Sequence, residues 1–480
     1  MCEICRRGFL GGMAAVGTAG VIPVAFAQGT SDTRFERPAI TLPQRGEFVV
    51  TNAYVITMDP QLGDIPNGSV HVRNGAIVAV GASVEAPGVQ VIDGRSRIVL
   101  PGLIDTHWHM WHTLFRGMSG DKREDGFFPT VTRFSGAMTA KDMYASTRLA
   151  AVEGLNAGIT SIHSWCHNIR SRAHAEADIR AINDTGLRGR WSFGQAIDQS
   201  AEQTIRLADM EALHKDWGAY SNEGLLSLGM AWRGIYRGNA YLPTEVYKTE
   251  FDTARRLGLP ITVHIGTVKT ATVGHIEGHA KQNLLGPDVN IVHGCSASAA
   301  EIQMIKDSGA SMSILPETEM RGGWGFPLIG EFMSAGVPVG LGVDTSALAG
   351  DVNLFAVLKF AMAIENVRAG SEFKLTARRA LELVTIGAAR IVGTDKQVGS
   401  LVPGKRADLI LVATDHLNMA VESDPVHLVV ESTQPANVDT VVVDGRILKR
   451  SGKLTHIQPT EVVDEARVAL ADVRKRANWR

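Results

Sequence analysis

The stretch "THWHMWH" places His107, His109 and His112 within six positions at the end of an apolar run. In an extended segment, side chains alternate between two sides, so His107 and His109 project from the same side. Two imidazoles placed in this way can bind one borderline metal such as zinc. An isolated His-x-His pair is weak evidence, so a metal site requires further ligands from the rest of the chain.

The elements that would position these histidines alternate between apolar strands and helices over residues 100–394. Continuously apolar strands separated by helices are typical of a parallel sheet covered on both faces. Eight strands in such an alternation predict an α/β fold, a (β/α)8 TIM barrel. The expected strands are residues 97–105, 158–165, 188–197, 224–232, 259–266, 289–294, 310–316 and 337–344.

Histidines and one aspartate stand at the ends of several of these strands. In (β/α)8 barrels the chemistry lies at the carboxyl ends of the strands, so these side chains should meet in one barrel mouth. Three histidines and one aspartate around an ion leave a position open for water, as catalytic sites need. The residues are His107 and His109 after the first strand, His163 after the second, His264 after the fifth, His293 after the sixth and Asp344 after the eighth.

The residue pattern at both ends of the chain differs from that of the middle. Residues 47–99 and 395–455 contain short Val- and Ile-rich strands that turn at Asn-Gly and Asp-Gly pairs. Such pairs are typical of β-turns between strands. We expect one small β-sandwich domain built from both segments, followed by a helical tail over 456–480.

Five stretches of the chain resemble the amidohydrolase superfamily: "PGLIDTHWH", "ITVHIG", "IVHG", "GLGVDTS" and "VGSLVPGKRADLILV". The resemblance extends over about residues 47–450 and is greatest to the branch of cytosine and guanine deaminases and triazine hydrolases. It implies a divalent metal, zinc or iron, held by His107, His109, His264 and Asp344. Asp344 would also shuttle protons, and His293 would polarise the substrate. Since the expected fourth strand has no lysine to bridge two ions, one metal is expected.

One position departs from the pattern of the deaminases in this superfamily. They carry a glutamate three residues after the histidine of strand five, whereas this chain has Thr267 in "HIGTVKT". That glutamate protonates a ring nitrogen, which threonine cannot do at neutral pH. We therefore expect hydrolysis of a non-peptide carbon–nitrogen bond in a cyclic amide, urea or related small molecule.

Two other functions remain open from the sequence. The chain could be an aminohydrolase that deaminates a heterocyclic amine, with Glu317 or Glu319 as the acid. It could also be a non-catalytic metal- or ligand-binding protein, although metal binding alone has no need of His293. Further substrate contacts are expected from Trp108, His112, His163 and Trp324, for each of which core packing is the alternative.

The first 27 residues have the features of a twin-arginine export signal. Arg6 and Arg7 precede an apolar stretch that ends in Ala25-Phe26-Ala27, a signal-peptidase pattern. We therefore expect a periplasmic protein. Removal of the signal leaves Cys166 and Cys295, which form no disulfide framework and are expected to be buried thiols.

The formal net charge of -2 gives no argument for a nucleic-acid partner or for an anionic membrane surface. We expect a small-molecule substrate, no nucleic acid, no membrane association after signal removal, and assembly into a homo-oligomer.

Overall fold

The computed structural model describes residues 34–421 and 423–479. The expected signal peptide, with Cys2 and Cys5, lies outside these residues. Cys166 and Cys295 are both free and buried, as expected. Within the described part of the chain, no helix combines the length and the apolar character needed to cross a bilayer.

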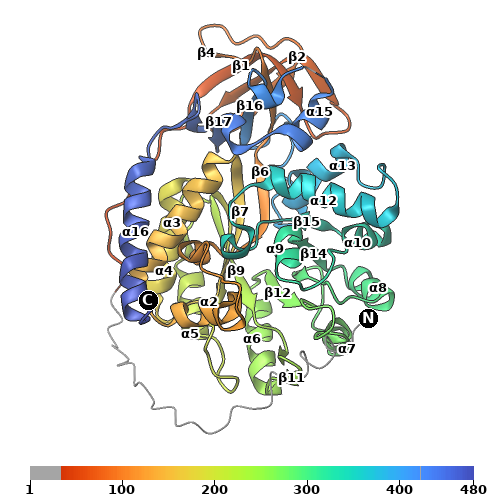
Figure 1. Cartoon of the computed structure of the whole chain (residues 1–480). Coiled ribbons are helices and arrows are strands. Elements are labelled where there is room, and N and C mark those ends of the chain that lie inside the picture. Colours follow the sequence, from red (N-terminus) through yellow and green to blue (C-terminus); the bar gives the residue numbers. More distant parts are fainter. Residues whose placement is uncertain (1–33, 422, 480) are drawn as a thin grey trace. The chain divides into compact units, whose positions relative to one another are not determined.

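Eight parallel strands form the central barrel (Figure 1). The sheet is closed beyond its last strand, where Trp108 and Asp344 form a parallel bridge and the Asp344 amide donates to the His107 carbonyl at 2.9 Å. The predicted (β/α)8 barrel is thus confirmed. In sheet order the strands are β6 (Leu103–Trp108), β7 (Ile159–Cys166), β8 (Arg188–Gly194), β9 (Leu226–Trp232), β12 (Ile261–Ile265), β13 (Val289–His293), β14 (Ser311–Ile314) and β15 (Val339–Leu341).

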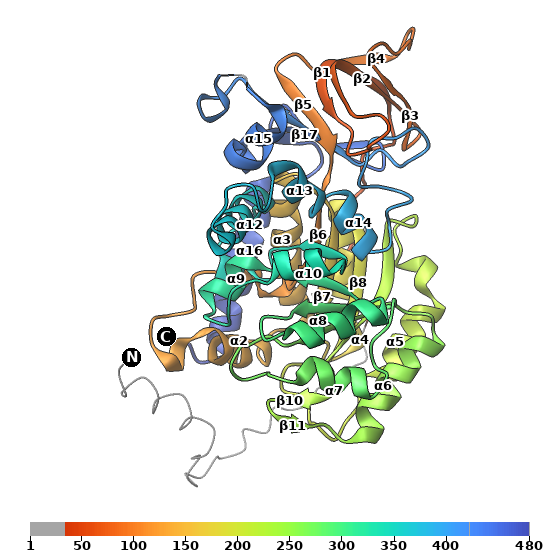
Figure 2. The same cartoon turned by 90° about the vertical axis from the view of Figure 1, so that its right-hand side faces the viewer.

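Helices follow the strands and surround the barrel (Figure 2). Helix α8 (Ala299–Ser308) illustrates why they begin and end where they do: Ser298 and Glu301 form a capping box, and Gly309 ends the helix in the left-handed conformation. The other helices of this layer are α3 (Ala140–Asn156), α4 (Arg172–Thr185), α5 (Leu207–Lys215), α6 (Thr244–Arg256), α7 (His275–Lys281), α10 (Ile329–Ala335), α12 (Leu354–Ala369), α13 (Ala377–Glu382) and α14 (Ile386–Ile391).

Strands from both ends of the chain form a second, smaller domain, as predicted. They hydrogen-bond as one mixed sheet of nine strands, in which β5 pairs parallel to β1 and antiparallel to β16. This sheet has its own apolar core, which includes Val50, Val70 and Leu409. Its strands are β1 (Glu47–Ile56), β2 (Asp64–Arg73), β3 (Ala76–Gly81), β4 (Gln90–Asp93), β5 (Arg97–Pro101), β16 (Leu409–Ala413), β17 (Val438–Val443), β18 (Arg446–Arg450) and β19 (Lys453–Leu454).

The single strand expected over residues 97–105 is in fact two strands in different sheets. β5 ends at Pro101 in the small domain and β6 begins at Leu103 in the barrel. Gly102 lies between them against Thr160, where a Cβ would come within 2.1 Å of the threonine Oγ1. The chain changes sheet at the one residue type that fits this contact.

Buried ion pairs join the small domain to the amino-terminal ends of the barrel strands. Arg188, the first residue of β8, donates to Asp408 at 2.6 and 3.1 Å and to Asp444 at 3.2 Å. This end of a barrel serves stability rather than chemistry. Helix α16 (Pro459–Arg476) occupies the expected tail and packs beside α3, where Arg148 donates to Glu465 at 2.6 Å.

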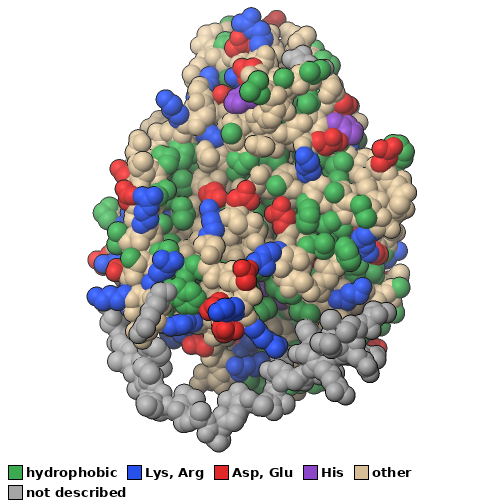
Figure 3. Space-filling view, in the orientation of Figure 1, with side chains coloured by type: hydrophobic (Ala, Val, Ile, Leu, Met, Phe, Trp, Pro, Cys, Tyr) green, Lys and Arg blue, Asp and Glu red, His purple; other side chains and the backbone are tan. Residues whose placement is uncertain are grey.

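On the face of the molecule in Figure 3, basic and acidic side chains are interspersed rather than gathered by sign. This mixture agrees with the small net charge of the chain.

Candidate metal centre and active-site pocket

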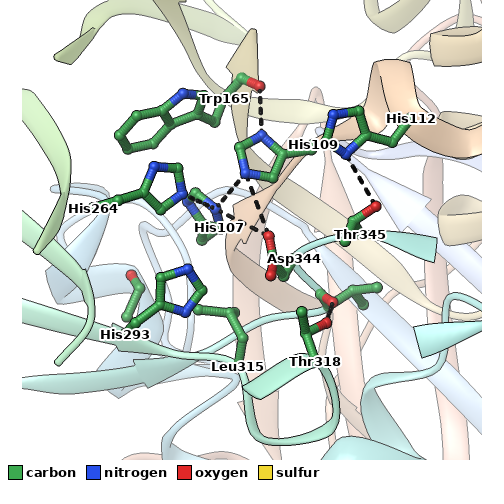
Figure 4. Close-up of polar contacts among 12 residues, drawn as sticks. His107, His109, His112, Trp165, His264, His293, Leu315, Thr318, Asp344 and Thr345 are labelled. Carbon is green, nitrogen blue, oxygen red and sulfur yellow. Dashed lines mark hydrogen bonds and ion pairs between the residues drawn. The ribbon is translucent and has the colours of Figure 1, made fainter. Parts of the chain in front are cut away.

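Three histidines and Asp344 converge at the carboxyl ends of β6, β12 and β15 (Figure 4). The Nε2 atom of His107 lies 3.1 Å from Nε2 of His109 and 3.2 Å from Nε2 of His264. Asp344 Oδ1 lies 3.4 Å from Nε2 of His107 and 3.3 Å from Nε2 of His109. The three histidines are a group whose ligand atoms could hold one metal ion.

These spacings fit a divalent cation at the centre of the group. Ligand bonds of about 2.1 Å in a tetrahedron place the ligand atoms roughly 3.4 Å apart, close to the distances between these donors. The Nδ1 atom of His109 lies 3.2 Å from the Trp165 carbonyl oxygen, so it carries the proton and Nε2 presents a lone pair. Three facing ring nitrogens and a carboxylate repel one another unless a cation lies among them.

Burial keeps the imidazoles in the form that binds metals. It lowers the pKa of His109 to about 4 and holds the pKa values of His107 and His264 well below the usual range. These side chains are therefore neutral at pH 7. Burial also raises the pKa of Asp344, which the neighbouring His109 and His293 partly offset. One oxygen of this carboxylate, Oδ2, is buried and has no hydrogen-bond partner within residues 34–421 and 423–479.

The two residues expected to act on substrate lie on unusual backbone. His293 has φ 77° and Asp344 has φ 62°, both in the left-handed region that non-glycine residues rarely adopt. Such strain is concentrated at functional sites, where the surrounding structure holds it. Here the His109 amide donates to the Asp344 carbonyl at 2.6 Å. Buried Asp105 accepts from the amides of His107 and Val343 at 2.9 Å each.

A cavity of about 370 Å³ opens onto this group, within the usual size range for small-molecule sites. Most of its exposed lining is apolar, and Asp344 is the only carboxylate among the described residues that line it. Thr267, the position that departs from the expected deaminase pattern, lies in the wall. The other lining residues are His109, His112, Phe127, Phe128, Val131, Thr132, His167, Gln195, Ile197, His264, Val268, His293 and Trp324.

Of the six expected substrate contacts, only His112 and Trp324 line this cavity. The Trp108 ring instead points outward and packs against Gly154 of α3. His163 lies inside the barrel and hydrogen-bonds Ser192 Oγ at 2.9 Å, because β7 continues three residues beyond it. Neither residue is among the described residues that line the cavity, so a substrate contact by either stays a prediction.

The two glutamates offered as acids also lie outside the cavity lining. Both belong to α9 (Pro316–Arg321), the short helix after β14. Glu317 is half-buried, and burial together with Asp351 raises its pKa to about 7. Glu319 is fully buried behind His293, with Oε1 3.3 Å from the His293 Nδ1. A direct contact of either glutamate with substrate stays a prediction.

Several wall residues were not expected from the sequence. His167, the first residue after β7, lies with its ring centroid 4.3 Å from that of His109. A second strand predicted to run on to Cys166 would have identified it, because His167 rather than His163 then follows the strand end. Phe127, Phe128 and Val131 come from α2 (Phe127–Ser135), a helix that the sequence pattern did not predict.

Comparison with known proteins agrees with this geometry. The family model described as the amidohydrolase family matches residues 98–448. The chain is 28% identical to a 5'-deoxyadenosine deaminase of Methanosarcina acetivorans, covering 90% of this chain and 99% of that enzyme. It is 29% identical to a 5-methylthioadenosine/S-adenosylhomocysteine deaminase of Symbiobacterium thermophilum, covering 88% and 98%.

Solved structures share the fold. An adenosine deaminase from Xanthomonas campestris with bound zinc gives a TM-score of 0.77 at 20% identity, covering 90% of this chain and 100% of that one. The atrazine chlorohydrolase of Arthrobacter aurescens complexed with zinc gives 0.75 at 21% identity, covering 88% and 100%. The chain belongs to the amidohydrolase family and is a metal-dependent hydrolase of carbon–nitrogen bonds other than peptide bonds.

Proposed function

We propose that this protein is a mononuclear zinc hydrolase that opens a cyclic amide, urea or related carbonyl compound of largely apolar character. The observation that carries the proposal is the cavity: apart from Asp344, no carboxylate among the described residues lines it, and Thr267 stands in its wall. The reaction must therefore proceed without a second carboxylic acid at the substrate.

Zinc is the proposed ion because three neutral imidazole nitrogens and one carboxylate oxygen suit it and leave a position for water. The ligands would be His107, His109, His264 and Asp344. When bound, such an ion lowers the pKa of a coordinated water to roughly 7 and makes it nucleophilic at neutral pH. Two of the structural neighbours are described with zinc.

Asp344 moves the proton in this proposal. Its Oδ1 faces the histidine nitrogens, and its buried Oδ2 has no hydrogen-bond partner in the described structure. Oδ2 can accept the proton of the attacking water while the water oxygen bonds to the carbonyl carbon. The carboxyl group then passes that proton to the nitrogen as the carbon–nitrogen bond breaks. His293 faces the cavity and steadies the attacking water.

The wall at residue 267 selects the kind of carbon that can be attacked. An aromatic amine needs a proton on a ring nitrogen before its carbon becomes electrophilic, and neither Thr267 nor the α9 glutamates supply one at the cavity surface. An amide or urea carbonyl is already polarised. A second candidate is deamination of a heterocyclic amine such as a nucleoside, which the names of the sequence relatives favour.

A substrate panel distinguishes these candidates. Zinc-loaded protein is incubated with cyclic amides, ureas and imides and with adenosine-type amines, and ring opening and ammonia release are measured separately. Ring opening without ammonia supports the proposal, whereas ammonia from the amines supports deamination. No turnover of either set would favour a binding protein. Chelation should abolish activity, and zinc should restore it.

The variant Thr267→Glu tests whether the residue at position 267 decides which reaction is catalysed. It supplies the acid that deaminases of this family use, so it should create or raise ammonia release from heterocyclic amines. Thr267→Gln has nearly the same volume but no acid and is the control. If both variants deaminate equally, the acid at this position does not decide the reaction.

We further propose that the protein is exported to the periplasm by the twin-arginine route. Support comes from Arg6 and Arg7 and from the Ala25-Phe26-Ala27 pattern. Replacement of both arginines by lysine should retain the precursor in the cytoplasm, as followed by fractionation and by the mass of the N-terminus.

A further inference from the structure

Glu319 is a fully buried carboxylate that the proposed reaction does not use directly. It has no lysine or arginine partner among the described residues, where its only ion-pair neighbour is His293. Burying a carboxylate in this way costs free energy unless hydrogen bonds compensate for the lost water. The side chain that Glu319 contacts is His293, a residue of the proposed site, so the carboxylate is placed to act through that histidine.

The hydrogen bonds of Glu319 determine which nitrogen of His293 carries a proton. One oxygen, Oε1, lies 3.0 Å from the Leu315 amide and 3.3 Å from the His293 Nδ1. The Leu315 N–H donates to this oxygen, and an oxygen that already accepts one hydrogen bond has a second lone pair for the His293 Nδ1–H. The proton is therefore on Nδ1, and Nε2 is the ring nitrogen left for the cavity that His293 lines.

The segment that carries Glu319 also fixes the plane of the ring. Trp324 packs edge-on against His293, with ring centroids 5.0 Å apart and planes at 81°. The Trp324 amide donates to the Glu319 carbonyl at 2.9 Å, so α9 and this tryptophan are held as one unit. His264 stacks on the His293 ring, with centroids 5.2 Å apart and planes at 18°.

We propose that Glu319 is a positioning residue that holds His293 in the tautomer with Nδ1–H on the carboxylate and a lone pair on Nε2. This inference rests on the proposed function of the site and adds the direction of one hydrogen bond. His293 then accepts a hydrogen bond from the attacking water and orients the oxygen lone pair toward the carbonyl carbon. Without the carboxylate, the proton can move to Nε2, which can no longer accept.

Two substitutions separate positioning from packing. Glu319→Met fills the same space but cannot accept a hydrogen bond. Glu319→Gln keeps an acceptor, and the Leu315 N–H selects its oxygen rather than its NH2 at the Oε1 place. Glu317→Gln, two residues earlier on the same helix and outside the cavity lining, is the matched control.

Steady-state kinetics of the zinc-loaded variants give the first readout. Glu319→Met should lower kcat about 10- to 100-fold, the usual effect of losing a partner that orients a histidine, with KM little changed. Glu319→Gln should recover most of kcat, and Glu317→Gln should match the wild type. Zinc content and thermal melts confirm that each variant is loaded and folded, and Glu319→Asp replaces the Met variant if that does not fold.

The second readout does not need turnover. With ¹⁵N-labelled histidine, the His293 signals are assigned by their loss in His293→Gln. Protonated Nδ1 and bare Nε2 are expected in the wild type and in Glu319→Gln, and a shift of the proton toward Nε2 is expected in Glu319→Met. A proton on Nε2 in the wild type, or an unchanged tautomer and kcat in Glu319→Met, overturns the inference. If the wild type turns over no substrate, the proposed function fails. The tautomer of His293 then still tests the inference about Glu319.

Discussion

The two oxygens of Asp344 serve different tasks in the proposed site. Oδ1 lies at His107 and His109, and Oδ2 is buried with no partner among the described residues. Asparagine keeps one coordinating oxygen but cannot take a proton from water. Asp344→Asn should lower kcat at least about 100-fold, the lower bound for loss of a general base, while zinc binding is only weakened. Metal analysis beside kinetics checks this, and near wild-type turnover would contradict it.

The sequence could predict the residues whose types themselves define the chemistry. His107, His109, His264 and Asp344 were expected at strand ends. His107 lies 3.1–3.4 Å from each of the other three, and His109 lies 3.3 Å from Asp344. His163 was misplaced because a shift of a few residues in the end of β7 moves a side chain from the mouth into the barrel interior. A run of apolar residues does not show at which residue a buried strand ends. The strand ends at Cys166, so His167 rather than His163 lies at the barrel mouth.

At the scale of elements, the sequence could not predict that α2 lines the cavity. The Phe127-Phe128 pair has no periodic pattern that says which site it covers. In the structure, Phe128 stacks on Trp324 with ring centroids 6.0 Å apart, although it is 60% exposed. The barrel itself was predictable because eight apolar strands alternating with helices allow few other folds.

Removal of the Phe128 ring should weaken substrate binding more than chemistry. Aromatic contacts of this kind contribute about 0.5–1.5 kcal/mol, so Phe128→Ala should raise KM roughly 2- to 10-fold for an aromatic or cyclic apolar substrate. The value of kcat should stay nearly the same. Phe373→Ala removes a phenylalanine that is 75% exposed and outside the cavity lining, and it serves as the control. A fall in kcat with KM unchanged for Phe128→Ala would contradict a role of this ring in substrate binding.

For the whole molecule, the ion pairs of Arg188 connect the two sheets. Removing one partner of a buried charged group leaves the others uncompensated, at a cost of about 3–5 kcal/mol. Arg188→Met should therefore lower the free energy of unfolding by about this amount, because Asp408 stays buried without another arginine partner among the described residues, whereas Asp444 keeps Arg45, Arg406 and Arg446. Arg95→Met removes an exposed pair with Asp93 and should change stability little. Equal urea midpoints for the two variants would refute the role of Arg188.

Acid should destabilise the molecule as soon as the pH falls below that of an unfolded histidine. Burial lowers the pKa of His163 to about 3, whereas an unfolded histidine has a pKa of about 6.5. The unfolded chain therefore binds more protons between these values, and stability falls as pH drops from 6.5 toward 3. Each such histidine adds up to about 1.4 kcal/mol per pH unit. Urea unfolding from pH 7 to 5 measures the slope, and His163→Asn should reduce it.

The pairing of β5 with both β1 and β16 has a consequence during synthesis. β5 leaves the ribosome early, but its partner β16 follows only after roughly 300 residues of barrel, about 15 to 60 s later at ordinary elongation rates. In that interval the edge of β5 has unpaired peptide groups that other nascent chains could join. The small domain is therefore completed last, and a chain truncated before Leu409 should aggregate rather than yield a free barrel.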